Sequence, residues 1–126
     1  MITLVEETGS TNADLAAALR SGEGWAEGRW LVARRQTAGR GRQGREWFDG
    51  AGNFMGSTVV QVAPQAGDVG PPPASLSFVA ALAVRDAAAA VIGEAGSLGL
   101  KWPNDVLLDG GKLSGILLEM VRGHIV

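Results

Sequence analysis

Residues 36–47 read Gln-Thr-Ala-Gly-Arg-Gly-Arg-Gln-Gly-Arg-Glu-Trp, and they lie between two stretches with the composition of β-strands. Arg29 to Gln36 holds the apolar run that predicts the strand before them, and Phe54 to Val62, rich in β-branched residues, predicts the strand after them. Thr37 to Gly52 has five glycines and three arginines in sixteen residues and no apolar period. This composition predicts a loop that is mobile in the absence of a ligand.

The residue types in this loop indicate a site for an anion. Glycine lets the backbone approach a ligand closely, and arginine supplies planar donors that match carboxylate and phosphate groups. Six of the eleven basic residues lie between Arg29 and Arg45 with no acid among them, although the net charge is −2. The glycine spacing differs from the dinucleotide fingerprint, and no Gly-Lys-Ser/Thr follows as in a phosphate-binding ATPase loop. A solvated flexible loop and an RNA-binding Gly-Arg segment remain alternatives.

Upstream of the loop, the sequence predicts a strand followed by a helix. Ile2 to Glu6 is rich in β-formers. Ser10-Thr11-Asn12 then opens a helix, and Thr11-x-x-Asp14 resembles a capping box with Asp in place of Glu. Hydroxyl groups at a helix start usually only cap it. The same position also offers hydroxyl, amide and free backbone N–H groups to a polar ligand.

Downstream of the loop, the pattern predicts a turn, a long helix and a hairpin. The turn spans Pro64 to Pro72 and the helix Pro73 to Ile92. The apolar positions that follow helical spacing and predict this helix are Leu76, Val79, Ala80, Ala83, Val84, Ala87 and Val91. The predicted strands that follow are Leu98 to Trp102, Val106 to Leu108 and Leu113 to Val121, with a glycine turn at Asp109-Gly110-Gly111.

These elements predict one α+β domain with a mixed β-sheet flanked by helices, covering residues 1–126. Strands and helices do not alternate as regular βαβ units, and no repeat is visible. His124-Ile125-Val126 looks like the start of another strand. We therefore expect the domain to be incomplete at its C-terminus.

Composition excludes several kinds of chemistry. The chain has no cysteine and His124 is its one histidine, which argues against a disulfide, a thiolate nucleophile and a multi-histidine metal site. The N-terminus lacks the pattern of a signal peptide. The apolar stretch from Leu76 to Ile92 contains Arg85 and Asp86, and we expect it to fall short of a membrane span. These features predict a cytoplasmic protein with no membrane partner.

Two more motifs complete the set of candidate sites. In Lys101-Trp102-Pro103-Asn104-Asp105, a lysine ends a short strand before a proline turn, although a lone lysine is usually a surface charge. Trp102 by itself is more typical of a core residue. Gly111 to Glu119 reads Gly-Lys-Leu-Ser-Gly-Ile-Leu-Leu-Glu, and a glycine inside an apolar strand often marks a ligand passing close by. A hairpin strand with a bulge is the alternative.

The order of these motifs along the chain resembles the biotin–protein ligase family. The shared segments are Glu7 to Asn12, Gln36 to Trp47, Gly52-Asn53, Lys101 to Asp105 and Gly111 to Glu119. The resemblance implies a catalytic domain of the fold shared with class II aminoacyl-tRNA synthetases. It also implies that ATP activates biotin to biotinyl-5'-AMP, that Mg²⁺ assists, and that biotin passes to a lysine of a biotin carboxyl carrier protein.

The resemblance also implies a role for individual residues. Ser10, Thr11, Asn12 and Gln36 would hold the biotin head group, and Gly115 would line the biotin pocket. Arg40, Gly41 and Arg42 would close over biotin and the adenylate. Lys101 would bridge the biotin carboxylate and the α-phosphate, which makes Lys101 and Arg42 the predicted catalytic residues. The predicted ATP-binding residues are Arg45, Trp47, Asn104 and Lys112; no protein metal site is predicted.

The chain departs from the family pattern at two loop positions. Gln43 stands where many members have arginine, and Glu46 precedes Trp47 where a basic residue can occur. The sequence starts at the first catalytic strand, so no N-terminal DNA-binding domain is expected. A lipoate or related acyl ligase, an inactive truncated relative and a nucleic-acid-binding module remain alternatives, and a homodimer stays open. The net negative charge argues against nucleic acid as a partner.

Overall fold

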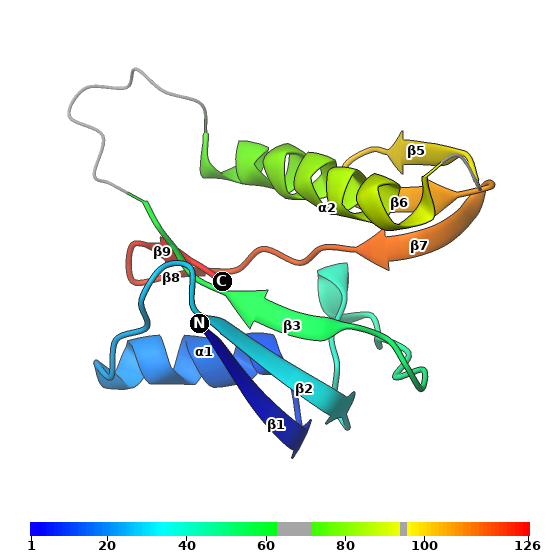
Figure 1. Cartoon of the computed structure of the whole chain (residues 1–126). Helices are drawn as coiled ribbons and strands as arrows, with labels where there is room; N and C mark the ends of the chain where they lie inside the picture. Colours follow the sequence, from blue (N-terminus) through cyan, green and yellow to red (C-terminus); the bar gives the residue numbers. More distant parts are fainter. Residues whose placement is uncertain (63–71, 94–95) are drawn as a thin grey trace. The chain divides into compact units, whose positions relative to one another are not determined.

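The computed structural model describes residues 1–62, 72–93 and 96–126 (Figure 1). The chain divides into two compact units, one made of Met1–Val69 with Glu119–Val126 and the other of Gly70–Leu118. The second unit is therefore an insertion in the sequence of the first. Apart from Pro72, the predicted turn from Pro64 to Pro72 lies outside the described residues.

The first unit contains two three-stranded sheets. The sheet β1-β2-β3 is mixed, because β1 is parallel to β2 and β2 is antiparallel to β3. The sheet β4-β9-β8 is antiparallel. The strands are β1 (Ile2–Thr8), β2 (Trp30–Gln36), β3 (Met55–Thr58), β4 (Val60–Gln61), β8 (Met120–Val121) and β9 (His124–Ile125). The predicted strand from Phe54 to Val62 is thus two strands, and the chain changes sheet at the buried Val59.

Helix α1 (Thr11–Ser21) supplies the core of this unit. Its buried side chains pack with residues of both sheets in one cluster of Leu15, Ala16, Leu19, Leu31, Val59, Val121 and Val126. Gly22, at φ 82°, ends the helix in the left-handed region that glycine tolerates. The predicted cap is corrected by one residue, because Ser10 is the N-cap and accepts from the Ala13 N–H at 3.4 Å. Asp14 instead accepts from the Thr8 hydroxyl.

The second unit is a helix on a three-stranded antiparallel sheet. A 3₁₀ turn (Pro73–Ser75) leads into α2 (Leu76–Ile92), and the sheet has the order β5 (Leu98–Lys101), β6 (Asp105–Leu108), β7 (Gly111–Gly115). The glycine turn between β6 and β7 is as predicted, and the register shifts between Val106 and Leu107. The predicted strand from Leu113 to Val121 is wrong in its middle, since β7 ends at Gly115 and β8 begins at Met120.

Helix α2 exposes many of its apolar residues, and it belongs to a longer apolar segment than the one considered in the sequence. Ala81 is its buried residue, whereas Val79 and Val91, two of the apolar positions with helical spacing, are 58% and 87% exposed. An alanine-rich helix has apolar residues all round, so its pattern marks no single face. Pro73–Ile92 is also long and apolar enough, by length and composition alone, to cross a membrane. The expectation that it falls short of a span is wrong by those criteria; within its unit, α2 contacts β5 and β6.

Candidate ligand-binding site

The first turn of α1 and the end of β2 lie at the same edge of the mixed sheet. Thr8 at the end of β1 is paired with Gln36 at the end of β2, and the two strands are parallel. The carboxyl ends of parallel strands share one edge of a sheet, so the segments that follow them start side by side. After β1 the chain enters α1 at its N-cap Ser10, and after β2 it enters the loop of residues 37–52, which we call the Gly-Arg loop. The topology thus brings the Ser10-Thr11-Asn12 motif next to the Gly-Arg loop.

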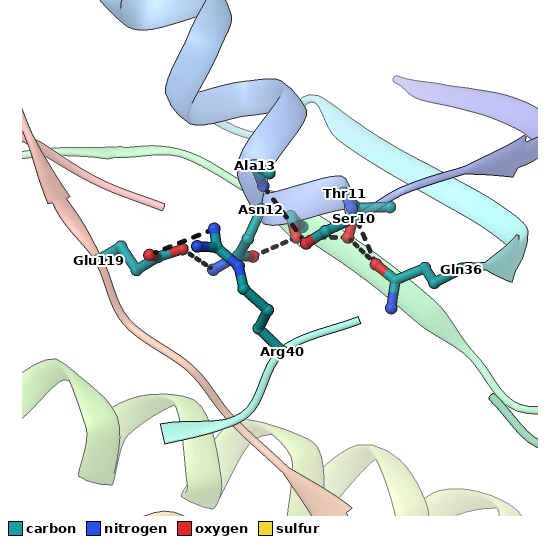
Figure 2. A network of polar contacts seen from close by, with 8 residues as sticks. Ser10, Thr11, Asn12, Ala13, Gln36, Arg40 and Glu119 are labelled. Carbon is teal, nitrogen blue, oxygen red and sulfur yellow. Dashed lines mark hydrogen bonds and ion pairs between the residues drawn. The ribbon is translucent and has the colours of Figure 1, made fainter. Parts of the chain in front are cut away.

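Hydrogen bonds join these segments. Gln36 Oε1 accepts from the Thr11 backbone N–H at 2.8 Å and from the Thr11 hydroxyl at 3.1 Å (Figure 2). Ser10 and Thr11 are buried, at 4% and 3% exposure. Ser10 caps the helix, so the interpretation of its hydroxyl group as a helix cap is confirmed. Because Gln36 Oε1 faces Thr11, the two N–H donors of its amide are on the other side of the group.

A continuous set of contacts runs from Gln36 to the Gly-Arg loop. Thr11 Oγ1 lies 2.7 Å from Ser57 Oγ, and the Ser57 hydroxyl donates to Asn12 Oδ1. Asn12 Nδ2 donates to Glu119 Oε2 at 3.2 Å, and Arg40 Nη2 lies 3.6 Å from Glu119 Oε1 (Figure 2). We call this set the polar chain; its members in order are Gln36, Thr11, Ser57, Asn12, Glu119 and Arg40.

The Gly-Arg loop has more local structure than its composition predicts. Its base is tied to the end of β1, because Thr37 N–H donates to Thr8 O at 2.9 Å and Ala38 N–H donates to Gly9 O at 2.8 Å. Arg40 and Glu46 form an antiparallel bridge. A 3₁₀ turn, Arg42–Gly44, lies between them, with Gln43 at φ 59°. Arg42 and Arg45 are exposed and Gly41 is half-buried. The mobility of the loop without ligand stays a prediction.

Gly39 is a point of close approach in this loop. A Cβ atom added there would lie 3.1 Å from Gln36 Nε2 and 3.2 Å from Trp47 Cβ. The Trp47 N–H also donates to Gly39 O at 3.0 Å. The glycine therefore leaves room for the side chain of Gln36 and for Trp47 close to the base of the loop.

The lysine motif, Lys101 to Asp105, lies in the second unit and contributes to the lining of a cavity. Lys101 ends β5 opposite Asp105 of β6. An open cavity of about 270 Å³ is lined mainly by apolar side chains, among them Phe78 and Leu82 of α2, and by Lys101 itself. Trp102 also lines it and is 77% exposed, so the interpretation of this residue as a core tryptophan is wrong. An ammonium group beside an apolar wall suits an anionic ligand with an apolar part.

The other predicted residues of this unit hold the lysine motif in place. Asn104 is buried, and its amide donates to Ile116 O just after β7. Gly115 is paired with Asp105, and Lys112 Nζ lies 2.9 Å from Asp105 Oδ1. These contacts fix the turn from Trp102 to Asp105 against β7. The ATP-binding roles of Asn104 and Lys112 stay predictions.

The structure thus brings the predicted residues together in two groups. Ser10, Thr11, Asn12, Gln36 and Arg40 meet in the first unit, and the loop residues Gly41, Arg42, Arg45 and Trp47 continue from them. Lys101, Asn104, Lys112 and Gly115 meet in the second. Sequence reasoning missed the roles of Gly39, Ser57 and Glu119. Glu119 was visible as the last residue of the Gly111 to Glu119 motif, whereas nothing singled out Ser57 within its strand.

Known proteins resemble this chain over most of its length. The model of the biotin/lipoate A/B protein ligase family matches residues 5–126. A biotin–[acetyl-CoA-carboxylase] ligase of Paracoccus denitrificans is 52% identical over 92% of this chain and 45% of its own length. The enzyme of that name from Mycobacterium tuberculosis is 45% identical over 99% of the chain and 46% of its length.

Solved structures show the same relationship. Biotin protein ligase from Aquifex aeolicus, in complex with biotin and ATP, has a TM-score of 0.81 and 30% identity, covering 98% of this chain and 48% of that one. The Leishmania major ligase with biotinyl-5-AMP has a TM-score of 0.78 and 26% identity, covering 98% and 53%. The chain belongs to the biotin/lipoate A/B protein ligase family, and its fold is that of the biotin protein ligase catalytic domain. It spans about half the length of the curated relatives it matches.

Proposed function

We propose that this chain carries the ligand-binding half of an ATP-dependent biotin–protein ligase. The observation that carries the proposal is the polar chain that links the first turn of α1, the end of β2 and the Gly-Arg loop. A biotin head group has one carbonyl acceptor and two N–H donors. The Gln36 amide donors and the hydroxyl and amide groups at the start of α1 offer the complementary set. The names and ligands of the related proteins support biotin and ATP as the substrates.

The reaction requires no protein nucleophile. The biotin carboxylate attacks the α-phosphorus of ATP; a C–O–P link forms, the bond to the β-phosphate breaks and pyrophosphate leaves. A carrier lysine amine then attacks the activated carbonyl carbon, loses a proton, forms an amide and displaces AMP. We propose the carrier domain of acetyl-CoA carboxylase as the protein substrate, for which the relatives are named. The chain's task is to align two anions and offset their charge, which suits Lys101 and Arg42.

Magnesium fits this scheme as an ion that is bound to ATP. Among the described residues, no three side chains of His, Asp or Glu come together as a metal site. Magnesium usually keeps several waters and binds through substrate phosphates with one or two carboxylates. We therefore propose that it enters on the ATP phosphates, where it offsets the charge of the pyrophosphate that leaves.

Direct detection of the intermediate tests the proposal. The intact protein is incubated with ATP, Mg²⁺ and either biotin or lipoate, and the acyl-adenylates are identified by mass spectrometry. We expect biotinyl-5'-AMP and, with a carboxylase carrier domain present, a biotinylated lysine. Lipoyl-AMP in place of biotinyl-AMP would contradict the choice of biotin. Neither adenylate, from a protein with a normal circular-dichroism spectrum, would contradict the proposed activity.

Ligands are expected to order the Gly-Arg loop beyond its tied base. Its glycines and exposed arginines suit a segment that closes around an anion. Hydrogen exchange should slow on adding biotin and ATP at the amides of residues 42 to 44 and 46, and change less at Thr37, Ala38, Gly41 and Arg45, which are already hydrogen-bonded. Equal exchange at 42 to 44 and 46 with and without ligands would show that this is only a surface loop.

Gly39→Ala is expected to weaken biotin binding by about tenfold, because the new methyl group must displace Gln36 or Trp47 by a few tenths of an ångström and misplacement by about 1 Å can cost 10²-fold. Isothermal titration calorimetry measures this. Gly99→Ala is the matched control, since a Cβ atom there meets nothing within 4 Å. Equal affinities for both variants would contradict the role given to Gly39.

A further inference from the structure

Glu119 is a charged member of the polar chain to which the proposed chemistry assigns no part. Both of its carboxylate oxygens are used, and by donors from different segments. Oε2 accepts from Asn12 Nδ2 at 3.2 Å and Oε1 lies 3.6 Å from Arg40 Nη2 (Figure 2). Asn12 belongs to the first turn of α1 and Arg40 to the Gly-Arg loop. One carboxylate thus links the two segments that are proposed to bind biotin.

The backbone of Glu119 is fixed to the core of the first unit. Its N–H donates to Val126 O, and the Val126 N–H donates back to Glu119 O, both at 3.0 Å. Val121 and Val126 are buried in the cluster that contains Leu15 and Leu19 of α1. The carboxylate therefore starts from a backbone position that packing sets relative to α1. Its side chain is 30% exposed, which leaves it within reach of the loop.

The charge of Glu119 also fixes the direction of the neighbouring hydrogen bonds. An ionised carboxylate can only accept, so Asn12 must turn its Nδ2 toward Glu119 and its Oδ1 toward Ser57. The single hydroxyl proton of Ser57 then goes to Asn12, so the Ser57 oxygen can only accept in its contact with Thr11, whose own hydroxyl proton is shared between Ser57 and Gln36 Oε1. Without the carboxylate, the amide of Asn12 has no group that selects one orientation over its flipped one.

We infer that Glu119 is a positioning residue for biotin binding: it holds Arg40 at the start of α1 and sets the orientation of the Asn12 amide before the ligand arrives. The inference rests on the proposed function. Since Glu119 acts through Arg40 and Asn12 and not on the reacting phosphorus, its loss is expected to raise the KM for biotin far more than it lowers kcat. Interactions that are already formed in the free protein reduce the conformational entropy that is lost when the ligand binds.

The first test is a graded set of substitutions in the intact protein, with biotin KM and kcat for biotinyl-AMP formation as the measurements. Glu119→Ala loses both contacts, and we expect a KM about thirtyfold higher with kcat within threefold of wild type. Glu119→Gln can still accept from Asn12 but presents no charge to Arg40, so an intermediate rise is expected. Glu6→Gln is the control, because it removes an exposed carboxylate–arginine pair elsewhere in the same unit, Arg34–Glu6 at 3.1 Å. A KM within twofold of wild type for Glu119→Ala, or a loss confined to kcat, would overturn the inference.

The second test asks whether Glu119 acts through Asn12. If it does, adding Asn12→Ala to Glu119→Ala should raise KM by much less than the product of the two separate effects, whereas independent roles would multiply. In the ligand-free protein, the side-chain NH₂ signals of Asn12 in a ¹H–¹⁵N spectrum should shift and broaden in Glu119→Ala and stay unchanged in Glu6→Gln. Unchanged Asn12 signals or multiplicative effects would overturn the inference. Failure of the wild-type protein to bind biotin would instead overturn the proposed function.

Discussion

Replacing Lys101 with alanine is expected to slow biotinyl-AMP formation by about 100- to 1000-fold, the usual cost of removing one donor from charge that develops in a transition state. Carboxylate and phosphate repel each other as they meet, and the ammonium group is the proposed charge between them. Lys101 is exposed at the end of β5, so its removal leaves no buried gap. The thermal midpoint should therefore stay close to wild type.

Single-turnover rates with saturating biotin and ATP measure this effect. Arg85→Ala is the control, since it removes an exposed cation from α2 in the same unit. Lys101→Arg keeps the charge but changes its shape, and it should recover only part of the rate. A rate for Lys101→Ala within threefold of wild type would remove the lysine from the chemistry.

Arg42→Gly is expected to let the activated intermediate escape. Biotinyl-AMP carries a phosphate beside a reactive acyl group, and a closed loop must shield it from water and hold it with a donor that stays charged. Arg42 is exposed at the start of the 3₁₀ turn, with no buried contact to lose. Its replacement should raise the ratio of bystander-protein biotinylation to carrier biotinylation by at least about tenfold, since charge-assisted contacts of this kind are worth about 1.5–3 kcal/mol.

The control for Arg42→Gly distinguishes the effect of losing the guanidinium group from the effect of a more flexible backbone. Gln43 has φ 59°, a conformation that favours glycine, so Gln43→Gly changes the same turn without removing a charge. Its ratio of bystander to carrier labelling should stay near that of wild type. If both variants leak equally, the loop retains the adenylate by its shape; if Arg42→Gly only lowers the overall rate, the residue serves binding alone.

The extent to which the sequence predicts this site depends on how far apart the partners are in the chain. Ser10 and Gln36 are the easier pair to relate, because Ser10 follows the end of a predicted strand, Gln36 ends the next predicted strand, and the structure shows these two strands to be parallel. Glu119 is not, since nothing local indicates that the residue before β8 reaches Asn12. Ser57 is likewise hidden, because a buried serine in a short strand looks like any other alternating position.

The same distinction applies to the fold. The glycine at 22 and the turn at Asp109-Gly110 are predictable, because local backbone geometry requires those residues. Helix α2 is predictable from its apolar spacing, but its buried residue is not, because alanine packs on either side of a helix. The end of β7 at Gly115 was also missed, since an apolar run of residues does not show where a strand leaves its sheet.

The insertion of Gly70–Leu118 into the sequence of the first unit has a consequence for folding. Strand β4 is followed by the whole inserted unit before the chain returns to pair β4 with β9 and to bring Glu119 to Asn12. Closing a loop costs conformational entropy, and this cost grows with the length of the loop. No contact offsets the cost until the returning segment docks. We therefore expect contacts between α1 and the mixed sheet to form before the Glu119 link. A nascent chain that has not yet delivered Glu119 is therefore expected to hold biotin weakly.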